Sequence, residues 1–363
     1  MPDLDYKGRV LRLQRLMSEA GVGVTMLSVG ADLPYFTGYE AMATERLTML
    51  VVPVVGEPIM FIPELEAPRV ASDGLEVVAW GETEDPIALV AKAASGSEQI
   101  TIGDHTWSVF LTALLRELPG VTWAPASTLT KHLRMRKEGP EIVALRSAAH
   151  AVDRVLARVP DEVAFAGRTE SEIADDLRRM TTGEGHQIAS FAIVASGPNG
   201  ASPHHSPGDR IVGPGDLIIC DFGGLFDGYC SDVTRTFSVG EASGEQIEVH
   251  SVVAAANETA RAMVAPGVPC EEVDRAARKV IENAGYGDRF IHRTGHGIGL
   301  EVHEHPYLVE GNQLPLEPGM TFSIEPGIYL PGRFGVRIED IVACSETGID
   351  ELNQADRSLV VVG

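Results

Sequence analysis

Two β-rich runs separated by a short loop fill residues 217–240, LIICDFGGLFDGYCSDVTRTFSVG. The Asp-Gly pair in the loop is a strong hairpin signal, so the segment predicts two antiparallel strands. One acid interrupts each run: Asp221 in the first and Asp232 in the second. One placement of the turn sets Asp221 opposite Asp232, and the other sets it opposite Thr234. Because side chains alternate along a strand, both registers put the two carboxylates on the same face.

Two like charges on a buried face repel each other and are costly unless a cation cancels them. A solvated face would remove that cost, but the flanking residues are strongly apolar. Two more acids have similar apolar settings: Glu325 closes a predicted strand in MTFSIEPGIYL, and Glu339 lies within a predicted strand over 335–344. Each acid alone could pair with a neighbouring arginine. Four such acids in one chain favour a shared cation site.

The segment HRTGHGIGLEVHEHP, residues 292–306, holds four of the 11 histidines of the chain. Four carboxylates and one imidazole would together carry four negative charges, which two divalent cations would balance. An oxygen-rich site with one nitrogen suits Mn²⁺ best, and Co²⁺ or Fe²⁺ next, in preference to Zn²⁺. Paired metals activate a hydroxide and polarise a carbonyl, so the chemistry indicated is hydrolysis.

The chain is acidic, since 29 Lys and Arg against 52 Asp and Glu give a formal net charge of −23. Such a charge argues against nucleic acid and against an anionic membrane surface as partners. The four cysteines form no CxxC pair, and the start, MPDLDYKGRV, has no apolar signal-peptide core. We therefore expect a reducing, cytoplasmic location and no membrane span.

At 363 residues, of which 44% are hydrophobic, the chain is long enough for two domains. The first third alternates predicted strands and helices, beginning with a helix over 9–20. A basic stretch then leads into a long amphipathic helix predicted over 140–158. Later helices are predicted at 171–181, 243–264 and 270–284. The pattern predicts an α/β protein with one domain over 1–130 and a second over 131–363.

Four stretches, in this order, resemble metallopeptidase family M24, which has the pita-bread fold: DFGGLFDGYCSDVTRT, HRTGHGIGLEVHE, EPGIY and GVRIED. SGPNGASPHH, residues 196–205, resembles the upstream histidine-bearing segment of that family. The resemblance covers residues 135–363. The N-terminal third, with LPYFTGYE, is similar to the creatinase-type domain that precedes the catalytic domain in Xaa-Pro peptidases. Methionine aminopeptidases lack such a domain, so the resemblance favours the Xaa-Pro branch.

The resemblance implies five metal ligands: Asp221, Asp232, His296, Glu325 and Glu339. Asp232 and Glu339 would bridge the two metals. It also implies that Thr234 and Arg337 steady the bridging carboxylates.

By the same resemblance, His204, His292 and His303 line the substrate site and hydrogen-bond the substrate or the tetrahedral intermediate. A metal-bridging hydroxide would attack the scissile carbonyl, and Glu325 would pass its proton to the leaving prolyl nitrogen. His303 and the metals would stabilise the oxyanion. His205 and His305 match no role in the family, and we expect them to be structural or solvated.

The implied function is hydrolysis of Xaa-Pro bonds at the N-terminus of dipeptides or short peptides. The resemblance also implies that the protein is a homodimer. In the prolidase branch a basic residue often follows HE-x-P and could hold the carboxylate of a dipeptide, but here that position is Tyr307. We therefore expect weak discrimination between Ala-Pro and Ala-Pro-Ala. The opposite outcome requires an arginine from elsewhere in the chain, such as Arg333, or from a partner subunit.

Two alternatives stay open. A small-molecule hydrolase or lyase could use the same scaffold and metals, and activity screening would separate it from a peptidase. A non-catalytic pita-bread module could serve binding instead. Such modules tend to lose ligands, and metal analysis would identify one.

Overall fold

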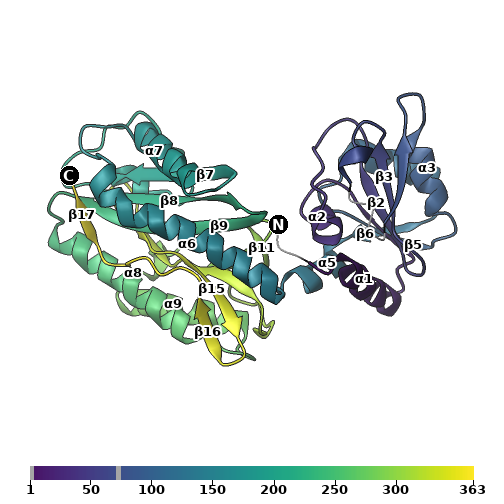
Figure 1. The fold of residues 1–363 in the computed structure, drawn as a ribbon. Helices are drawn as coiled ribbons and strands as arrows, with labels where there is room; N and C mark the ends of the chain where they lie inside the picture. The colour runs from purple at the N-terminus through teal and green to yellow at the C-terminus, as the bar shows by residue number, and fades with distance from the viewer. Residues whose placement is uncertain (1–3, 71–74) are drawn as a thin grey trace. The chain divides into compact units, whose positions relative to one another are not determined.

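The computed structural model describes residues 4–70 and 75–363. Residues 1–3, the beginning of the stretch expected to carry no signal peptide, lie outside the described residues. The chain divides into two compact units, one ending at Arg134 and the other beginning at Met135 (Figure 1). Within the described ranges, no helix is long and apolar enough to cross a bilayer.

The N-terminal unit is a six-stranded sheet in the order β4-β3-β2-β1-β5-β6, with helices packed against it. Its elements are α1 (Tyr6–Ala20), β1 (Val24–Leu27), α2 (Asp32–Thr37), β2 (Met49–Pro53), β3 (Ile59–Pro63), a 3₁₀ turn (Ala67–Arg69), β4 (Glu76–Trp80), α3 (Pro86–Ala93), β5 (Gln99–Ile102), α4 (Ser108–Glu117), β6 (Thr122–Pro125) and α5 (Ser127–Arg134). β1 runs antiparallel to β2 and parallel to β5, so the sheet is mixed.

Local sequence accounts for α1, the helix predicted over 9–20. The Asp5 carboxylate accepts a hydrogen bond from the Gly8 amide and so caps the first turn. Leu13 and Met17, one turn apart, are fully buried. Gly21 ends the helix at φ 71°, a left-handed conformation that glycine adopts without strain.

The C-terminal unit places two larger sheets between pairs of helices and contains a third, two-stranded sheet. Its helices are α6 (Gly139–Glu162), α7 (Glu170–Gly183), α8 (Gly244–Ala262) and α9 (Cys270–Asn283), with 3₁₀ turns at Gly197–Ala201 and Gly287–Arg289. Its strands are β7 (Ile188–Ser196), β8 (Leu217–Phe226), β9 (Tyr229–Val239), β10 (Gly295–Gly297), β11 (Glu304–Leu308), β12 (Thr321–Ile324), β13 (Gly327–Leu330), β14 (Phe334–Arg337), β15 (Asp340–Ser345), β16 (Gly348–Glu351) and β17 (Val360–Val362). The four predicted helices are thus confirmed, with small shifts at their ends.

The first of the larger sheets has the order β17-β9-β8-β7, and the second has the order β11-β10-β12-β15-β16. The third sheet is the pair β13-β14. α6 packs against β8 and β9, and α7 packs against β7. α8 and α9 pack side by side and contact the second sheet (Figure 1). The apolar core is correspondingly divided, one part lying beneath α6 and α7 and the other beneath α8 and α9.

The predicted hairpin is formed by β8 and β9, and the register is the one that pairs Asp221 with Thr234. Asp232 pairs with Gly223, two residues along β8 from Asp221, so both acids face the same side. Asp227 and Gly228 form the turn, with φ values of 49° and 87°. Such left-handed residues match the twist of a two-residue hairpin, which explains the Asp-Gly pair.

The continuous strand predicted over 335–344 is wrong, because the chain is divided into β14 and β15 around Glu339. β14 pairs with β13, whereas β15 pairs with β12. The chain therefore changes its partner strand at residues 338–339. Glu339 instead makes an isolated bridge to Thr234, donating its amide to the Thr234 carbonyl at 3.1 Å.

Candidate metal centre and active site

The β8–β9 hairpin supplies the first two predicted ligands. Asp221 and Asp232 are buried, with 8% and 4% of their surface exposed. One oxygen of each, Oδ1, has no hydrogen-bond partner among the described residues. A buried carboxylate oxygen that accepts no hydrogen bond is unfavourable unless a positively charged group binds it.

His296 lies in β10 between two glycines that allow close backbone packing. A Cβ at Gly295 would lie 1.9 Å from the Ser323 carbonyl oxygen, and one at Gly297 would lie 2.2 Å from that of His305. The Nδ1 atom of His296 lies 3.1 Å from the Gly297 carbonyl, so this nitrogen carries the proton. Nε2 is therefore unprotonated, and its lone pair faces the carboxylates. A metal-binding imidazole needs this arrangement.

Glu325 and Glu339, each just beyond the end of a strand, complete the predicted ligand set. Glu325 follows the end of β12, and its amide donates to the Thr294 carbonyl at 2.8 Å. Oε2 of Glu339 accepts a hydrogen bond from the Thr234 hydroxyl at 2.6 Å. Oε1 of Glu339 has no such partner in the described chain.

The five side chains lie close together, although the first and the last of them, Asp221 and Glu339, are more than 100 residues apart in the sequence. Nε2 of His296 lies 3.3 Å from Glu325 Oε1, 3.7 Å from Asp232 Oδ2 and 3.8 Å from Glu339 Oε1. Ligand atoms of Asp221, Asp232 and Glu339 also lie within 4.8 Å of one another. Two of the candidate groups thus share Glu339, and a third joins Asp232 and His296 to His303.

Burial and crowding disturb the protonation of this cluster. Burial raises the pKa of Asp232, and the charges of Glu339 and Asp221 raise it further. Burial and the charge of Glu325 likewise raise the pKa of Glu339. Burial raises the pKa of Glu325 to about 7. Burial lowers the pKa of His296 to about 3, which keeps its imidazole neutral.

These residues fit a pair of divalent cations. The three orphaned oxygens, Asp221 Oδ1, Asp232 Oδ1 and Glu339 Oε1, belong to buried acids that repel one another. Cations bound there would satisfy each oxygen and cancel the repulsion. Oxygen atoms predominate with one nitrogen, a donor set that hard and borderline divalent metals accept.

Arg337 and Thr234, the residues predicted to steady the cluster, contact it directly. The Thr234 hydroxyl that donates to Glu339 accepts from Arg337 Nε at 3.2 Å. A second nitrogen of the guanidinium donates to Asp221 Oδ2 at 2.5 Å. Arg337 therefore fixes the oxygen of Asp221 that is not orphaned.

A third bond connects Arg337 to His292 through Tyr329. Arg337 donates to the Tyr329 hydroxyl at 2.9 Å, and that hydroxyl lies 2.8 Å from His292 Nε2. The Nδ1 atom of His292 is 2.7 Å from the Arg293 carbonyl and must carry the proton. Tyr329 is therefore the donor to Nε2. Both ring nitrogens of His292 have hydrogen-bond partners in the protein. The histidine could therefore bond to a substrate only if one of these two bonds breaks.

A cavity of about 580 Å³ opens over the cluster. Its lining includes all five predicted ligands and the three predicted substrate histidines, His204, His292 and His303. The His303 ring centroid is 4.1 Å from that of His296, and its pKa is lowered by burial and then by Arg293. His204 and His303 are exposed at the cavity rim, where they can reach a bound molecule. Phe191, Ile193 and Val302 add apolar surface.

An arginine from elsewhere in the chain, the alternative left open above, does lie beside Tyr307. The guanidinium carbon of Arg293 lies 4.3 Å from the centroid of the Tyr307 ring, and Arg293 lines the cavity. Antiparallel pairing of β10 with β11 brings these two segments together, with His296 opposite Tyr307. Arg333, the alternative candidate, is exposed and instead forms an ion pair with Glu245.

Sequence reasoning missed two residues that contact the site, besides Arg293. Tyr329 lay within the EPGIY stretch, but nothing in the sequence indicated that its hydroxyl would join Arg337 to His292. Ser323 accepts from the His296 amide at 3.0 Å and lies 3.2 Å from Glu325 Oε1. Its signal was its spacing, two residues before Glu325 and hence on the same strand face.

Histidines with no predicted role at the site are placed away from the cluster. His205 Nε2 lies 2.8 Å from Glu170 Oε2, in a buried group that also includes Ser196. His186 is buried, with Nε2 2.8 Å from the Ser231 hydroxyl. His305 packs its ring against Tyr307, with centroids 4.8 Å apart, and is absent from the cavity lining.

The fold and the cluster agree with the family matches of the chain. Residues 143–346 match the model of metallopeptidase family M24, and residues 9–136 match the creatinase/prolidase N-terminal domain. The chain therefore belongs to metallopeptidase family M24. It is an α/β enzyme, a peptidase that uses divalent metal ions. In the sequence, its pita-bread catalytic unit follows a creatinase-like unit.

Similar proteins cover almost the whole chain. The probable dipeptidase PepE of Mycobacterium tuberculosis is 43% identical over 363 residues, covering 98% of this chain and 96% of that protein. The Xaa-Pro dipeptidase of Lactobacillus helveticus is 35% identical, with 97% and 98% covered. The crystal structure of a prolidase from Thermococcus sibiricus is 41% identical, with a TM-score of 0.94 and with 99% and 100% of the two chains covered.

Proposed function

We propose that this metallopeptidase is an Xaa-Pro dipeptidase whose two divalent cations are held by Asp221, Asp232, His296, Glu325 and Glu339. The observation that carries the proposal is a cavity in which this cluster and Arg293, which has no ion pair with any described residue, face the same space. The similarity to enzymes named dipeptidase or prolidase supports it.

The bound cations would supply an activated water and polarise the scissile carbonyl. Glu325 is placed to accept the proton of that water, because its carboxylate belongs to the cluster and lines the cavity where the substrate would bind. The leaving prolyl nitrogen needs that proton, since it departs as a secondary amine. Glu325 would therefore serve both as a ligand and as the proton carrier.

The histidines would bind the substrate around this point. The lowered pKa of His303 keeps its ring neutral, so that one nitrogen can donate to the developing oxyanion. His204 lies across the same cavity and can donate to the substrate. We assign His292 to the pocket wall, where Tyr329 and the Arg293 carbonyl hold its ring in a single tautomer.

Arg293 is our candidate for the group that binds the free carboxylate of a dipeptide. Its side chain is half-buried in the cavity lining and stacked on Tyr307, and it forms no ion pair with any described residue. A guanidinium in this setting can bind a carboxylate through two parallel hydrogen bonds. A longer peptide would place a neutral amide there instead.

The test compares Ala-Pro with its C-terminal amide, Ala-Pro-NH2, in three proteins. The wild type should prefer the free acid by about tenfold to hundredfold in kcat/KM, because a hydrogen bond to a charged group contributes a free energy of that size. Arg293→Ala should lose that preference, and Arg333→Ala, a matched change outside the cavity, should keep it. Retention of the full preference in Arg293→Ala would contradict this assignment.

We further propose Mn²⁺ as the native metal, a homodimer as the assembly and the cytoplasm as the location. The oxygen-rich donor set supports the metal, and the four free, buried cysteines support a reducing compartment. The dimer rests on the family resemblance. Metal analysis of protein purified without added metal, and sedimentation of the same sample, test the first two.

A further inference from the structure

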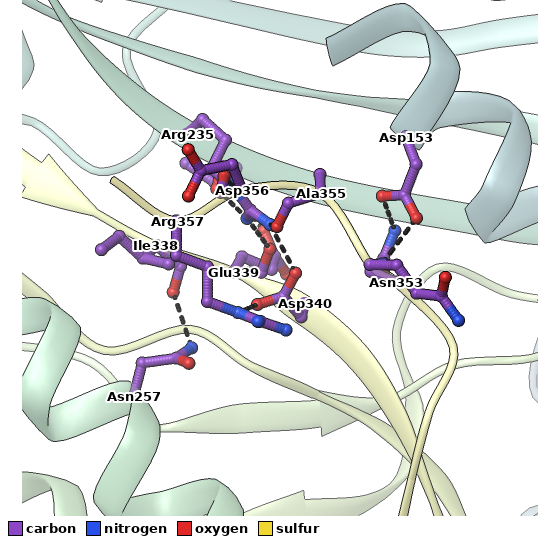
Figure 2. A network of polar contacts seen from close by, with 12 residues as sticks. Asp153, Arg235, Asn257, Ile338, Glu339, Asp340, Asn353, Ala355, Asp356 and Arg357 are labelled. Carbon is purple, nitrogen blue, oxygen red and sulfur yellow. Dashed lines mark hydrogen bonds and ion pairs between the residues drawn. The ribbon is translucent and has the colours of Figure 1, made fainter. Parts of the chain in front are cut away.

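Asn257 of α8 contacts the backbone next to two of the proposed metal ligands. Its side chain is fully buried. The amide nitrogen Nδ2 donates to the carbonyl oxygens of Ile324, at 2.9 Å, and Ile338, at 3.3 Å. Figure 2 shows the bond to Ile338, which lies next to Glu339. Each accepting residue immediately precedes a carboxylate of the cluster, so one amide joins the backbones that carry Glu325 and Glu339.

These two backbones need such support, because each carboxylate lies outside a regular strand. Glu325 follows the last residue of β12, and Glu339 occupies the break between β14 and β15. The acceptor of Asn257, Oδ1, has no hydrogen-bond partner in the part of the chain that the structure describes. The two donated bonds are therefore what this buried amide contributes.

Arg235 holds the same segment from the opposite side. Its guanidinium donates to the carbonyls of Thr234, at 2.8 Å, and Glu339, at 2.6 Å. It also donates to Asp340 Oδ1 at 2.7 Å, and Arg357 donates to the other oxygen of Asp340 at 2.6 Å (Figure 2). The chain is thus held on both sides of Glu339. Asn257 binds the preceding carbonyl, that of Ile338. Arg235 binds the Glu339 carbonyl, and Arg235 and Arg357 both bind the Asp340 side chain.

We propose that Asn257 is a positioning residue for the metal centre, setting the separation between the carboxylates of Glu325 and Glu339. This inference rests on the proposed function, since it takes both acids to be ligands. Groups that orient metal ligands contribute through the geometry of the site, and their loss typically weakens metal binding about tenfold to hundredfold. The effect passes through the backbone, because Asn257 does not line the cavity.

The main variant is Asn257→Leu, which keeps a similar volume and removes both donors. The matched control is Asn353→Leu. Asn353 is also fully buried, and its amide nitrogen donates to Ala149 and to Asp153 on α6. Figure 2 shows Asp153 beside it. Its oxygen accepts from the Ile341 amide, so it bonds the strand after Glu339 but neither carbonyl that Asn257 holds. Both variants should unfold at a lower temperature when metal-free, because each leaves buried polar groups without partners.

Metal binding separates the two. Titration of the metal-free proteins with Mn²⁺ in a calorimeter should give Kd values about tenfold to hundredfold weaker for Asn257→Leu and close to the wild type for Asn353→Leu. The visible absorption of the Co²⁺-loaded proteins should change in Asn257→Leu alone, because it reports the arrangement of the ligands. Asn257→Asp, which keeps the shape and offers at most one donor, should show the same direction of change if the leucine variant does not fold.

Wild-type affinity and an unchanged Co²⁺ spectrum in the folded Asn257 variants would overturn the inference, and so would an equal loss in Asn353→Leu. Neither outcome would affect the proposed function, provided that the wild type binds Mn²⁺ and cleaves Ala-Pro. A wild-type protein that binds no Mn²⁺ would instead overturn the proposed function and this inference with it.

Discussion

The hydroxyl of Tyr329 lies 2.8 Å from Nε2 of His292 and joins this histidine to Arg337, which donates to Asp221. Burial, followed by the charge of Arg337, lowers the pKa of His292 to about 3. His292 is therefore neutral, with its proton fixed on Nδ1. Hydrogen bonds thus connect Asp221 to His292 in the cavity wall, and the Tyr329 hydroxyl is the link between Arg337 and His292.

Replacing Tyr329 by phenylalanine should lower kcat/KM for Ala-Pro about tenfold to hundredfold. The change leaves Arg337 and His292 each without one partner in a buried setting, and a hydrogen bond to a charged group is typically worth about 1.5–3 kcal/mol. The metal content should not change, because no predicted ligand is altered. Tyr286→Phe, which removes a hydroxyl bonded to Glu248 on the exposed side of the unit, is the control. Equal activity of the two variants would remove the Tyr329 chain from the mechanism.

Asp232→Asn should abolish activity and reduce the bound metal, as measured by elemental analysis. The amide keeps the shape of the side chain but lacks the charge that a bridging ligand needs. The metal-free variant should nevertheless unfold at a temperature at least as high as the metal-free wild type. The reason is that burial and Glu339 raise the pKa of Asp232, so its charge is unfavourable without a cation. Asp227→Asn, in the exposed hairpin turn, should change none of these values. Full activity with two metals bound would exclude Asp232 from the site.

Substituting His303 or His204 by alanine should reduce turnover by orders of magnitude while both metals stay bound. Loss of one oxyanion donor typically costs about 2.7–4 kcal/mol. His305→Ala is the neighbouring control and should be nearly silent, because His305 lies outside the cavity lining. A damaging His305→Ala together with a silent His303→Ala would show that the roles in this segment are reversed.

The stability of the metal-free protein should depend on pH through His250. Burial, followed by the charge of Arg235, lowers the pKa of this histidine to about 4. Between that value and about 6.5, its pKa in an unfolded chain, the unfolded state binds more protons, so stability falls as the pH is lowered. From pH 7 to pH 5, the wild type should lose about 2 kcal/mol more of its free energy of unfolding than His250→Gln does. Urea unfolding at the two pH values measures this difference, and equal losses would contradict the neutral, buried state of His250.

Features set by neighbouring residues could be predicted from the sequence. The hairpin that carries Asp221 and Asp232 was predictable because an Asp-Gly turn and side-chain alternation are local properties. The helices of the catalytic unit followed from apolar spacing for the same reason. That five donors would converge came from residue types and from resemblance, while the register was left open between two possibilities.

Features that depend on the pairing of distant segments could not be predicted. The break at Glu339 arises because β14 and β15 pair with different strands, which the apolar run over 335–344 does not encode. Arg293 and Tyr307 meet only because β10 and β11 pair. Asn257 looks like an ordinary polar residue in a helix, and its function depends on which carbonyls lie beneath it.

The most direct test of metal-dependent Xaa-Pro dipeptide hydrolysis offers metal-stripped and Mn²⁺-reconstituted protein three substrates side by side: Ala-Pro, Ala-Pro-Ala and Met-Ala-Ser. We predict that only the reconstituted protein is active, that it cleaves Ala-Pro with the highest kcat/KM, and that it releases little methionine. Undiminished activity of the stripped protein, or fastest cleavage of Met-Ala-Ser, would contradict the account.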